Sequence, residues 1–318
     1  MTVFTVNGAE FGWDEIVAAA QAWGEWRPFV EQTRQSLACL ALATETGQLP
    51  AGDEAREAAI AFRYAHNLIS AEETQAWLGA WEMTVEDWMN YLRGQLLRER
   101  WLNRLKEIAA ANPVSDEEVA EIIKKYAVFG DNFIEWARKL AGRAALAFGA
   151  AGSVSIDSTG RAPRELIEYI EAGFDEQRRL MVTPKMIEAR IADHRLDWIR
   201  FDCRYIWFPE ERIAREAACC VIEDGLTLDE VAYDARSVVQ QWNFYLDEIE
   251  ADARPHFLAA REGEWLGPMK IMEGFPLFSV NNKQMPSASD PQIRRRAEQA
   301  IINSLIEKAM NERVRWVM

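Results

Sequence analysis

The sequence predicts an α+β protein that is mainly helical. Over most of the 318 residues, apolar side chains recur every three or four positions, which is the period of an amphipathic helix. Strand-like runs are short and few. With 49% hydrophobic and 27% charged residues, 11 Pro and 17 Gly, the composition is that of a chain that folds throughout and can bury a sizeable core.

Several helix starts are marked by a hydroxyl residue followed three positions later by an acid. In such a capping box each side chain accepts a hydrogen bond from the backbone N–H of the other residue. The sequence predicts boxes that begin at Ser70, Ser115 and Thr227, and Thr183 with Pro184 adds the variant in which proline takes the first helical position.

A stripe of large apolar residues begins at Trp77 and continues through Trp81, Val85, Trp88 and Leu92 at helical spacing. It predicts a helix, or a pair of helices, with one face that buries something large and aromatic. Two interpretations stay open for the tryptophans. They form a core, or they line a groove for the apolar side chains of an extended polypeptide, since an indole ring offers much contact area at little entropic cost.

Strand-like runs occupy 3–6, 201–208, 277–280 and 314–317. The first and last are expected to pair, because a lone strand leaves its backbone groups without partners. Small and turn-forming residues at 149–153 and 157–160 predict a linker. We therefore expect a helical lobe at 1–148, a linker with connecting helices at 149–197, an α+β domain at 198–283, and a C-terminal helix and strand at 284–318 that return to the first lobe.

The charge and the N-terminus restrict location and partners. The 51 acidic and 36 basic residues give a net charge of −15, so nucleic acids and anionic lipid surfaces are unfavourable partners. The N-terminal residues lack the basic and apolar regions of a signal peptide, and no run is long enough for a membrane span. These observations predict a cytoplasmic protein without membrane insertion.

The common catalytic and metal-binding patterns are missing from the sequence. The four cysteines suit reduced, buried side chains, and the three histidines His66, His194 and His256 are isolated, without the spacing of a metal site. Adjacent acids such as those at 72–73 begin helices, where they favour the helix dipole. Phosphate-binding glycine loops and the nucleophile motif of hydrolases do not occur. We expect neither a metal nor another cofactor.

Several segments, in order along the chain, carry a resemblance to a known family. They are Val6-Asn7-Gly8 before a helix that starts near Trp13, Val182-Thr183-Pro184, Arg204-Tyr205-Ile206-Trp207-Phe208, the run GLTLDEVA at 225–232, and GEWLGP at 263–268 followed by GFPLFSV at 274–280. Together they resemble SurA/PrsA-type chaperones that carry parvulin (PpiC) prolyl isomerase domains. The resemblance implies a helical client-binding lobe and a parvulin-like domain.

The sequence departs from that family at the residues that matter for catalysis. Parvulins place two histidines in the site, and here the corresponding positions hold Tyr205 and Pro276. The aromatic residue of the proline pocket corresponds to Leu258 or is lost. Proline has neither a polar side chain nor a backbone donor. The resemblance therefore implies a degenerate domain that binds polypeptide with little or no isomerase activity.

The sequence thus favours a non-catalytic, chaperone-like or substrate-presenting protein that holds an extended polypeptide for maturation or export, with a maturation enzyme or a transporter as a further partner. The expected peptide-binding residues are Trp77, Trp81, Trp88, Tyr205, Trp207, Leu258 and Phe275. One alternative is a prolyl isomerase that works through Tyr205, Cys203 or other noncanonical groups. The other is a structural subunit whose Trp-rich face is covered permanently by a partner.

Overall fold

The computed structural model describes residues 2–149, 162–271 and 273–317. The chain forms two compact units. The first, here called the helical unit, comprises Met1–Gln177 and Ile306–Met318, and the second, the sheet unit, comprises Arg178–Leu305. The predicted division into four segments stays a prediction, and most of the predicted linker, at 150–153 and 157–160, lies outside the described residues.

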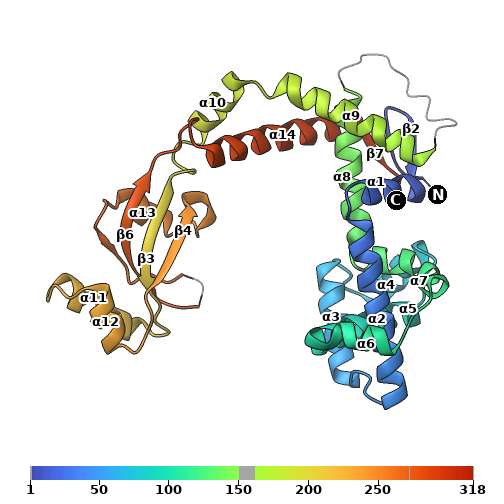
Figure 1. Cartoon of the computed structure of the whole chain (residues 1–318), viewed down its shortest axis with the longest axis horizontal. Coiled ribbons are helices and arrows are strands. Elements are labelled where there is room, and N and C mark those ends of the chain that lie inside the picture. The colour runs from blue at the N-terminus through green and yellow to red at the C-terminus, as the bar shows by residue number, and fades with distance from the viewer. Residues whose placement is uncertain (1, 150–161, 272, 318) are drawn as a thin grey trace. The chain divides into compact units, whose positions relative to one another are not determined.

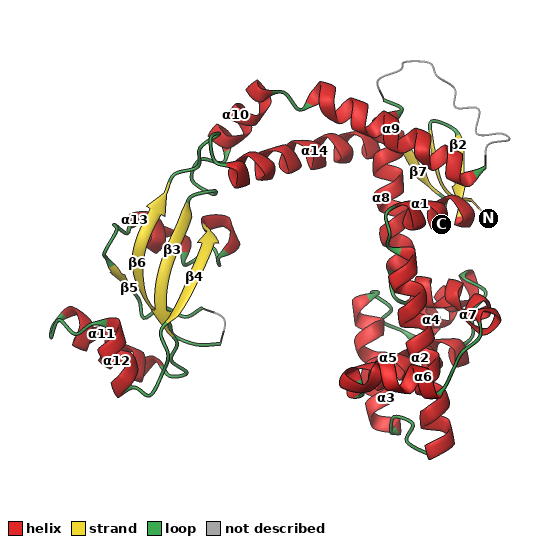
Figure 2. Cartoon of the chain, in the orientation of Figure 1, coloured by secondary structure: helices red, strands yellow, loops and turns green. Residues whose placement is uncertain are grey.

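Helices dominate the helical unit, as Figure 2 shows in red. They are α1 (Trp13–Ala22), α2 (Trp26–Thr46), α3 (Gly52–Ala65), α4 (Ala71–Ala80), α5 (Val85–Arg100), η1 (Leu102–Arg104), α6 (Leu105–Ala111), α7 (Asp116–Phe129), α8 (Asn132–Ala147), most of α9 (Pro163–Met181) and the end of α14 (Pro291–Arg313). The capping boxes predicted here are confirmed. At the start of α4, Ser70 Oγ accepts from the Glu73 N–H at 3.0 Å and the Glu73 carboxylate accepts from the Ser70 N–H at 2.8 Å, and α7 repeats this arrangement.

A three-stranded antiparallel sheet joins the two ends of the chain within the helical unit. Its order is β2 (Ala9–Gly12), β1 (Thr2–Val6), β7 (Val314–Trp316). Val6 pairs with Val314, so the expected pairing of the chain ends is confirmed. Strand β2 was not predicted. Phe4, fully buried, stacks on Phe11 of β2 at 4.8 Å between ring centroids and also packs on Trp316.

The C-terminal turns of α14 pack closely on α8. Gly142 of α8 faces Ile306, and a Cβ atom added at this glycine would lie 2.6 Å from Ile306 Cγ2. Two turns further along α14, the Arg313 guanidinium donates a hydrogen bond to the carbonyl oxygen of Ala145 at 3.0 Å. These contacts hold the last residues of the chain against the helical unit.

The sheet unit contains a four-stranded antiparallel sheet in the order β4-β3-β6-β5 (Figure 1). Its elements are α10 (Pro184–Asp193), β3 (Arg200–Ile206), α11 (Glu211–Ile222), α12 (Leu228–Asp234), β4 (Gln240–Tyr245), η2 (Leu246–Glu248), α13 (Arg254–Ala259), β5 (Trp265–Leu266), β6 (Leu277–Gln284) and most of α14. The helix starts predicted at Thr183 and Thr227 are confirmed, the latter as a capping box. Strands β4 and β5 were not predicted.

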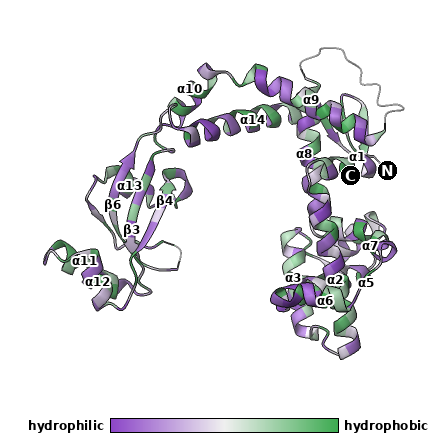
Figure 3. Ribbon diagram, viewed as in Figure 1, coloured by the Kyte–Doolittle hydropathy of each residue, from purple (hydrophilic) through white to green (hydrophobic). Residues whose placement is uncertain are grey.

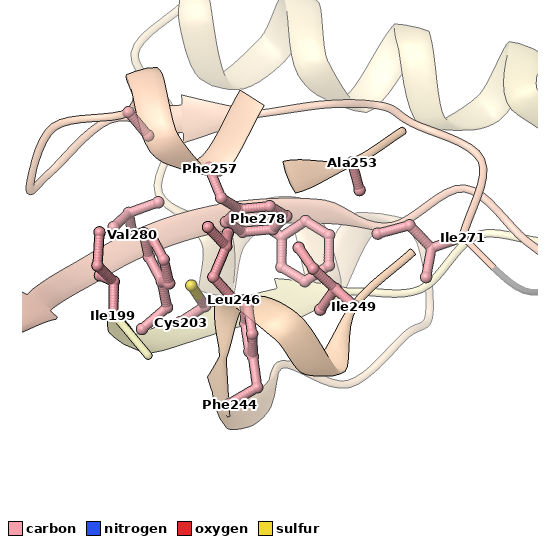
Figure 4. Packing of buried hydrophobic residues seen from close by; sticks show 12 residues of the cluster. Ile199, Cys203, Phe244, Leu246, Ile249, Ala253, Phe257, Ile271, Phe278 and Val280 are labelled. Atoms are coloured by element: carbon pink, nitrogen blue, oxygen red, sulfur yellow. The ribbon is translucent and has the colours of Figure 1, made fainter. Parts of the chain in front are cut away.

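Each face of this sheet covers a separate apolar cluster, because successive residues of a strand point to opposite faces. On one face, Cys203 and Phe278 join Phe257 of α13 in the cluster drawn in Figure 4, here called the α13 cluster. On the other face, Ile206 and Leu277 pack with residues of α11 and α12, which we call the α11 cluster.

The fold class predicted from the sequence, a mainly helical α+β protein, is confirmed. Hydrophobic and hydrophilic residues are mixed along the labelled helices (Figure 3). Among the described residues, no helix has the length and apolar character needed to span a membrane.

Candidate functional site

Tyr205 and Pro276, which take the two expected histidine positions, lie in β3 and directly before β6, the strand that pairs with β3. Tyr205 of β3 is half-buried, and its ring packs on Phe278 at 5.5 Å and on Trp242 at 6.3 Å. Its hydroxyl donates a hydrogen bond to Gln240 Oε1 at 2.5 Å. Pro276 is buried just before β6. The hydroxyl of Tyr205 is thus already engaged, and Pro276 offers no side-chain donor.

Cys203, two residues before Tyr205, belongs to the α13 cluster and is 1% exposed. Burial raises the pKa of its thiol to about 12, and the nearby charge of Asp202 adds to this effect. The thiolate is the reactive form of cysteine, so at neutral pH this side chain stays protonated and unreactive.

The remaining predicted residues of this unit divide between the two faces of the sheet. Leu258 packs on the α13 cluster, as Tyr205 does, so both belong to the same side of the sheet. Phe275 packs on the α11 cluster, on the opposite face. Trp207 covers Gly274, and its indole ring leaves no room for a Cβ atom at this glycine.

Trp242 of β4 is a further half-buried aromatic residue beside Tyr205 on the face of the α13 cluster. The sequence analysis missed it. Since β4 itself was not predicted, nothing in the sequence placed this residue on the sheet.

The predicted tryptophan stripe of the helical unit divides into two aromatic groups. Trp77 and Trp88 both pack on Phe62, whereas Trp81 packs on Phe133. Trp77 lies half-buried among Phe62, His66 and Phe129, with ring centroids 5.6–6.0 Å apart. Trp88 is 6% exposed, and its indole N–H has no partner among the described residues. Trp81 caps the C-terminus of α4 and is half-buried. The turn between α4 and α5 interrupts the stripe, so these rings do not form one continuous surface.

Trp81 lines a cavity of about 240 Å³, here called the aromatic pocket. Its lining residues are Val3, Trp13, Trp81, Glu82, Met83, Lys124, Lys125, Val128 and Phe133. The ring of Phe133 stacks on Trp13 at 5.0 Å and meets Trp81 edge to face at 5.7 Å. This cavity has aromatic walls, and its lining side chains include those from the start of α1, the α4–α5 turn, α7 and the start of α8.

Two lysines of α7 stand at the aromatic pocket and differ in their partners. The ammonium group of Lys125 is 2.6 Å from the Asp87 carboxylate. Burial alone would raise the pKa of Asp87, but hydrogen bonds from Lys125 and Thr84 outweigh burial and lower it. Lys124 is exposed and lies 5.3 Å from the centroid of the Trp13 ring. No ion pair to Lys124 occurs among the described residues.

A second cavity of the helical unit, about 380 Å³, is bordered by α3, α4 and α5. Its floor includes Leu78 and Trp88, and its exposed sides carry Ile60 (44% exposed) and Val85 (52% exposed) with Arg56 at the edge. It is a shallower apolar surface than the aromatic pocket and lacks a comparable set of stacked rings.

The described residues hold no cluster of three or more histidine, cysteine or acidic side chains arranged for a metal ion. His66 packs on Phe62 and His194 stacks on Trp198 at 4.6 Å. Both contacts are ordinary packing of imidazole rings.

The chain is similar to solved structures of the chaperone group that its sequence resembles. The peptidylprolyl isomerase PrsA from Bacillus anthracis is 12% identical, and the match covers 68% of this chain and 96% of that chain with a TM-score of 0.26. A SurA-like chaperone of Campylobacter jejuni is 9% identical, with 99% of this chain and 98% of that chain covered and a TM-score of 0.21. No family model and no curated protein matches the chain. Similarity at this level carries no functional inference.

Proposed function

We propose that this protein is chaperone-like, that it binds extended or unfolded polypeptide segments, and that it does not catalyse prolyl isomerisation. The aromatic pocket carries the proposal. At about 240 Å³ it is smaller than the 300–1,000 Å³ typical of small-molecule sites, and it suits one or two apolar side chains. Rigid aromatic walls such as Trp13, Trp81 and Phe133 are typical of surfaces that bind polypeptide.

The surroundings of Tyr205, Cys203 and Pro276 support the proposal that the protein does not catalyse prolyl isomerisation. A prolyl isomerase must weaken the conjugation of the X-Pro amide, because this conjugation causes the barrier of about 18–20 kcal/mol to cis/trans rotation. The Tyr205 hydroxyl already donates a hydrogen bond to Gln240, the Cys203 thiol is buried with a raised pKa, and Pro276 has no polar side chain. NMR exchange spectroscopy on X-Pro peptides tests this part. A rate above background that vanishes in Tyr205→Phe would favour the isomerase.

The charge supports a preference among clients. A net charge of −15 favours neutral or basic polypeptides and repels acidic ones. We further propose that the protein works in the cytoplasm and presents its client to a maturation enzyme or a transporter. Cell fractionation and capture of bound proteins from the native host test these two statements.

Substitution of Trp81 tests the pocket. Trp81→Ala removes one aromatic wall, and we expect affinity for an aromatic-rich, chemically unfolded polypeptide to fall about tenfold or more, with a melting temperature close to that of the parent. Tyr64→Ala is the matched control, since Tyr64 is exposed in the same unit and is not among the residues that line the pocket. It should leave affinity unchanged.

A second variant separates binding from folding. Trp88→Ala removes a buried ring that packs on Phe62 and should cost about 3–5 kcal/mol of stability. If Trp81→Ala also lowers stability and affinity together, the pocket is core and the proposal fails. Absence of any binding by the isolated chain, together with co-purification in a fixed complex, would favour the structural subunit.

A further inference from the structure

Strand β4 forms one edge of the four-stranded sheet and contains neither the charged residues nor the proline that often protect such an edge. Its sequence, Gln240 to Tyr245, contains no proline, no lysine and no charged residue. Gln240, Gln241 and Asn243 are exposed. Natural edge strands are usually blocked by charge, proline, a bulge or a covering segment, because an open edge pairs with any extended chain. Figure 2 shows β4 beside β3 at the border of the sheet.

The register identifies the backbone groups that point away from the sheet. Arg200 lies opposite Tyr245, and the Leu246 N–H donates to the Ile199 carbonyl at 3.0 Å, so Leu246 and Ile199 are a hydrogen-bonded pair. In an antiparallel ladder such pairs alternate with non-bonded ones. The N–H and C=O groups of Gln241, Asn243 and Tyr245 therefore point outward.

One of these three outward positions already has a partner. The Glu248 carboxylate accepts a hydrogen bond from the Tyr245 N–H at 3.0 Å, which agrees with the alternation. For Gln241 and Asn243 the described residues provide no partner strand. Two consecutive outward positions, each with one donor and one acceptor, are thus open.

The side chains along this edge differ between the two faces. Trp242 lies on the face of the α13 cluster, with its ring 4.4 Å from Phe244 and 6.0 Å from Phe278. On the opposite face, Gln241 and Asn243 are neutral and polar. An added strand with alternating apolar and polar residues would place its apolar side chains beside Trp242.

We propose that β4 binds an extended polypeptide segment by antiparallel strand addition through the outward backbone groups of Gln241 and Asn243. This rests on the proposed function and names a second contact for the same client. A second copy of the chain is disfavoured as the occupant because each copy carries −15, whereas a neutral or basic segment meets no such repulsion.

N-methylated peptides test the hydrogen bonds without altering the protein. The probe is a blocked heptapeptide, Lys-Val-Thr-Val-Thr-Val-Lys, whose valines would face Trp242 and whose threonines would pair with Gln241 and Asn243. We expect methylation of both threonine N–H groups to weaken binding about tenfold or more. The matched isomer, methylated at the first two valines, should bind within about threefold of the parent. Equal affinity of the two isomers, or the reverse order, overturns the proposal.

A protein variant provides the second test. Asn243→Pro removes an outward N–H that makes no bond to β3, so the ladder within the sheet stays intact. This variant should lower the affinity for the unmethylated peptide about as much as threonine methylation does. Asn243→Thr, which keeps the N–H donor, should leave that affinity unchanged. In the unmodified protein, the peptide should slow hydrogen exchange of the Gln241 and Asn243 amides. Protection that instead rises with protein concentration, without peptide, identifies a dimer and overturns the proposal.

Failure of strand addition at β4 can be distinguished from failure of the proposed function. If strand addition fails while Trp81→Ala still lowers affinity for an unfolded polypeptide, only the β4 proposal is lost. If the unmodified chain binds no unfolded polypeptide at all, the proposed function itself is wrong.

Discussion

Gly142 offers a direct test of how the end of α14 is held on the helical unit. Glycine in a helix interior is destabilising relative to alanine by about 0.5–1 kcal/mol, so Gly→Ala is normally favourable there. At Gly142, however, the new Cβ atom would lie 2.6 Å from Ile306 Cγ2 and 3.3 Å from Met310 Sδ. Carbon atoms prefer separations of about 3.5–4.0 Å, so the two helices must move apart by roughly 1 Å.

The gain in helix propensity and the steric clash with Ile306 oppose each other, and we expect the clash to decide the sign of the change in stability. Overpacking of this kind costs about 1–3 kcal/mol, which exceeds the helical gain. We expect Gly142→Ala to be destabilising by about 1–2 kcal/mol, which lowers the melting temperature by about 2–4 °C for each kcal/mol. Gly79→Ala is the control, because Gly79 also lies in a helix but has no atom within 4 Å of an added Cβ. That variant should melt higher than the parent.

A double-mutant cycle measures the contact itself. Ile306→Ala removes the methyl group that the new Cβ atom meets, so the double variant should be more stable than the sum of the two single effects, by about 0.5–3 kcal/mol. Thermal unfolding followed by near-ultraviolet circular dichroism reports the tertiary packing of the tryptophans. If Gly142→Ala raises the melting temperature as Gly79→Ala does, the close approach of α8 and α14 is wrong.

Three further predictions concern stability and reactivity. Removal of the residues after Pro291 deletes β7 and should lower the melting temperature of the helical unit, and an unchanged melting temperature would contradict the closure of the sheet. Backbone and side-chain hydrogen bonds from Ser115 lower the pKa of Glu118 below its ordinary value, so its contribution to stability is present above that ordinary pKa and is lost as the pH falls through the lowered one. In Glu118→Gln, the free energy of unfolding should fall less on acidification than it does in the parent protein. Iodoacetamide at pH 8 should alkylate the exposed Cys219 and spare Cys203 in the native protein, as mass spectrometry of the digested protein would show.

The sequence predicted elements whose signals are local. The capping boxes at Ser70 and Ser115 are complete within four residues, and each folds as expected. The β-branched runs at the two ends of the chain also predicted β1 and β7, because a strand needs a partner and each run was the other's only candidate. Strand β2 escaped prediction because its four residues are too few to show an alternation before α1 begins.

Strand β4 and the aromatic pocket could not be predicted, for a different reason. The polar residues Gln240, Gln241 and Asn243 have low strand propensity, and their place in the sheet depends on pairing with β3, about 40 residues away. The pocket joins Trp13, Trp81 and Phe133, which come from distant parts of the sequence. Periodicity gives the buried face of each helix, but it does not give which helices meet.

The position of β7 has a consequence for synthesis of the protein. Residues of β1 are made before Arg178–Leu305, and β7, the strand that pairs with them, is made only after that whole segment. At roughly 5–20 residues per second, a ribosome needs on the order of 15–60 s to translate from Phe4 to Val314. During that time one edge of β1 has no partner, and Phe4 lacks its contact with Trp316. The nascent chain therefore passes through a state in which its own first strand is open to pairing with other extended polypeptides.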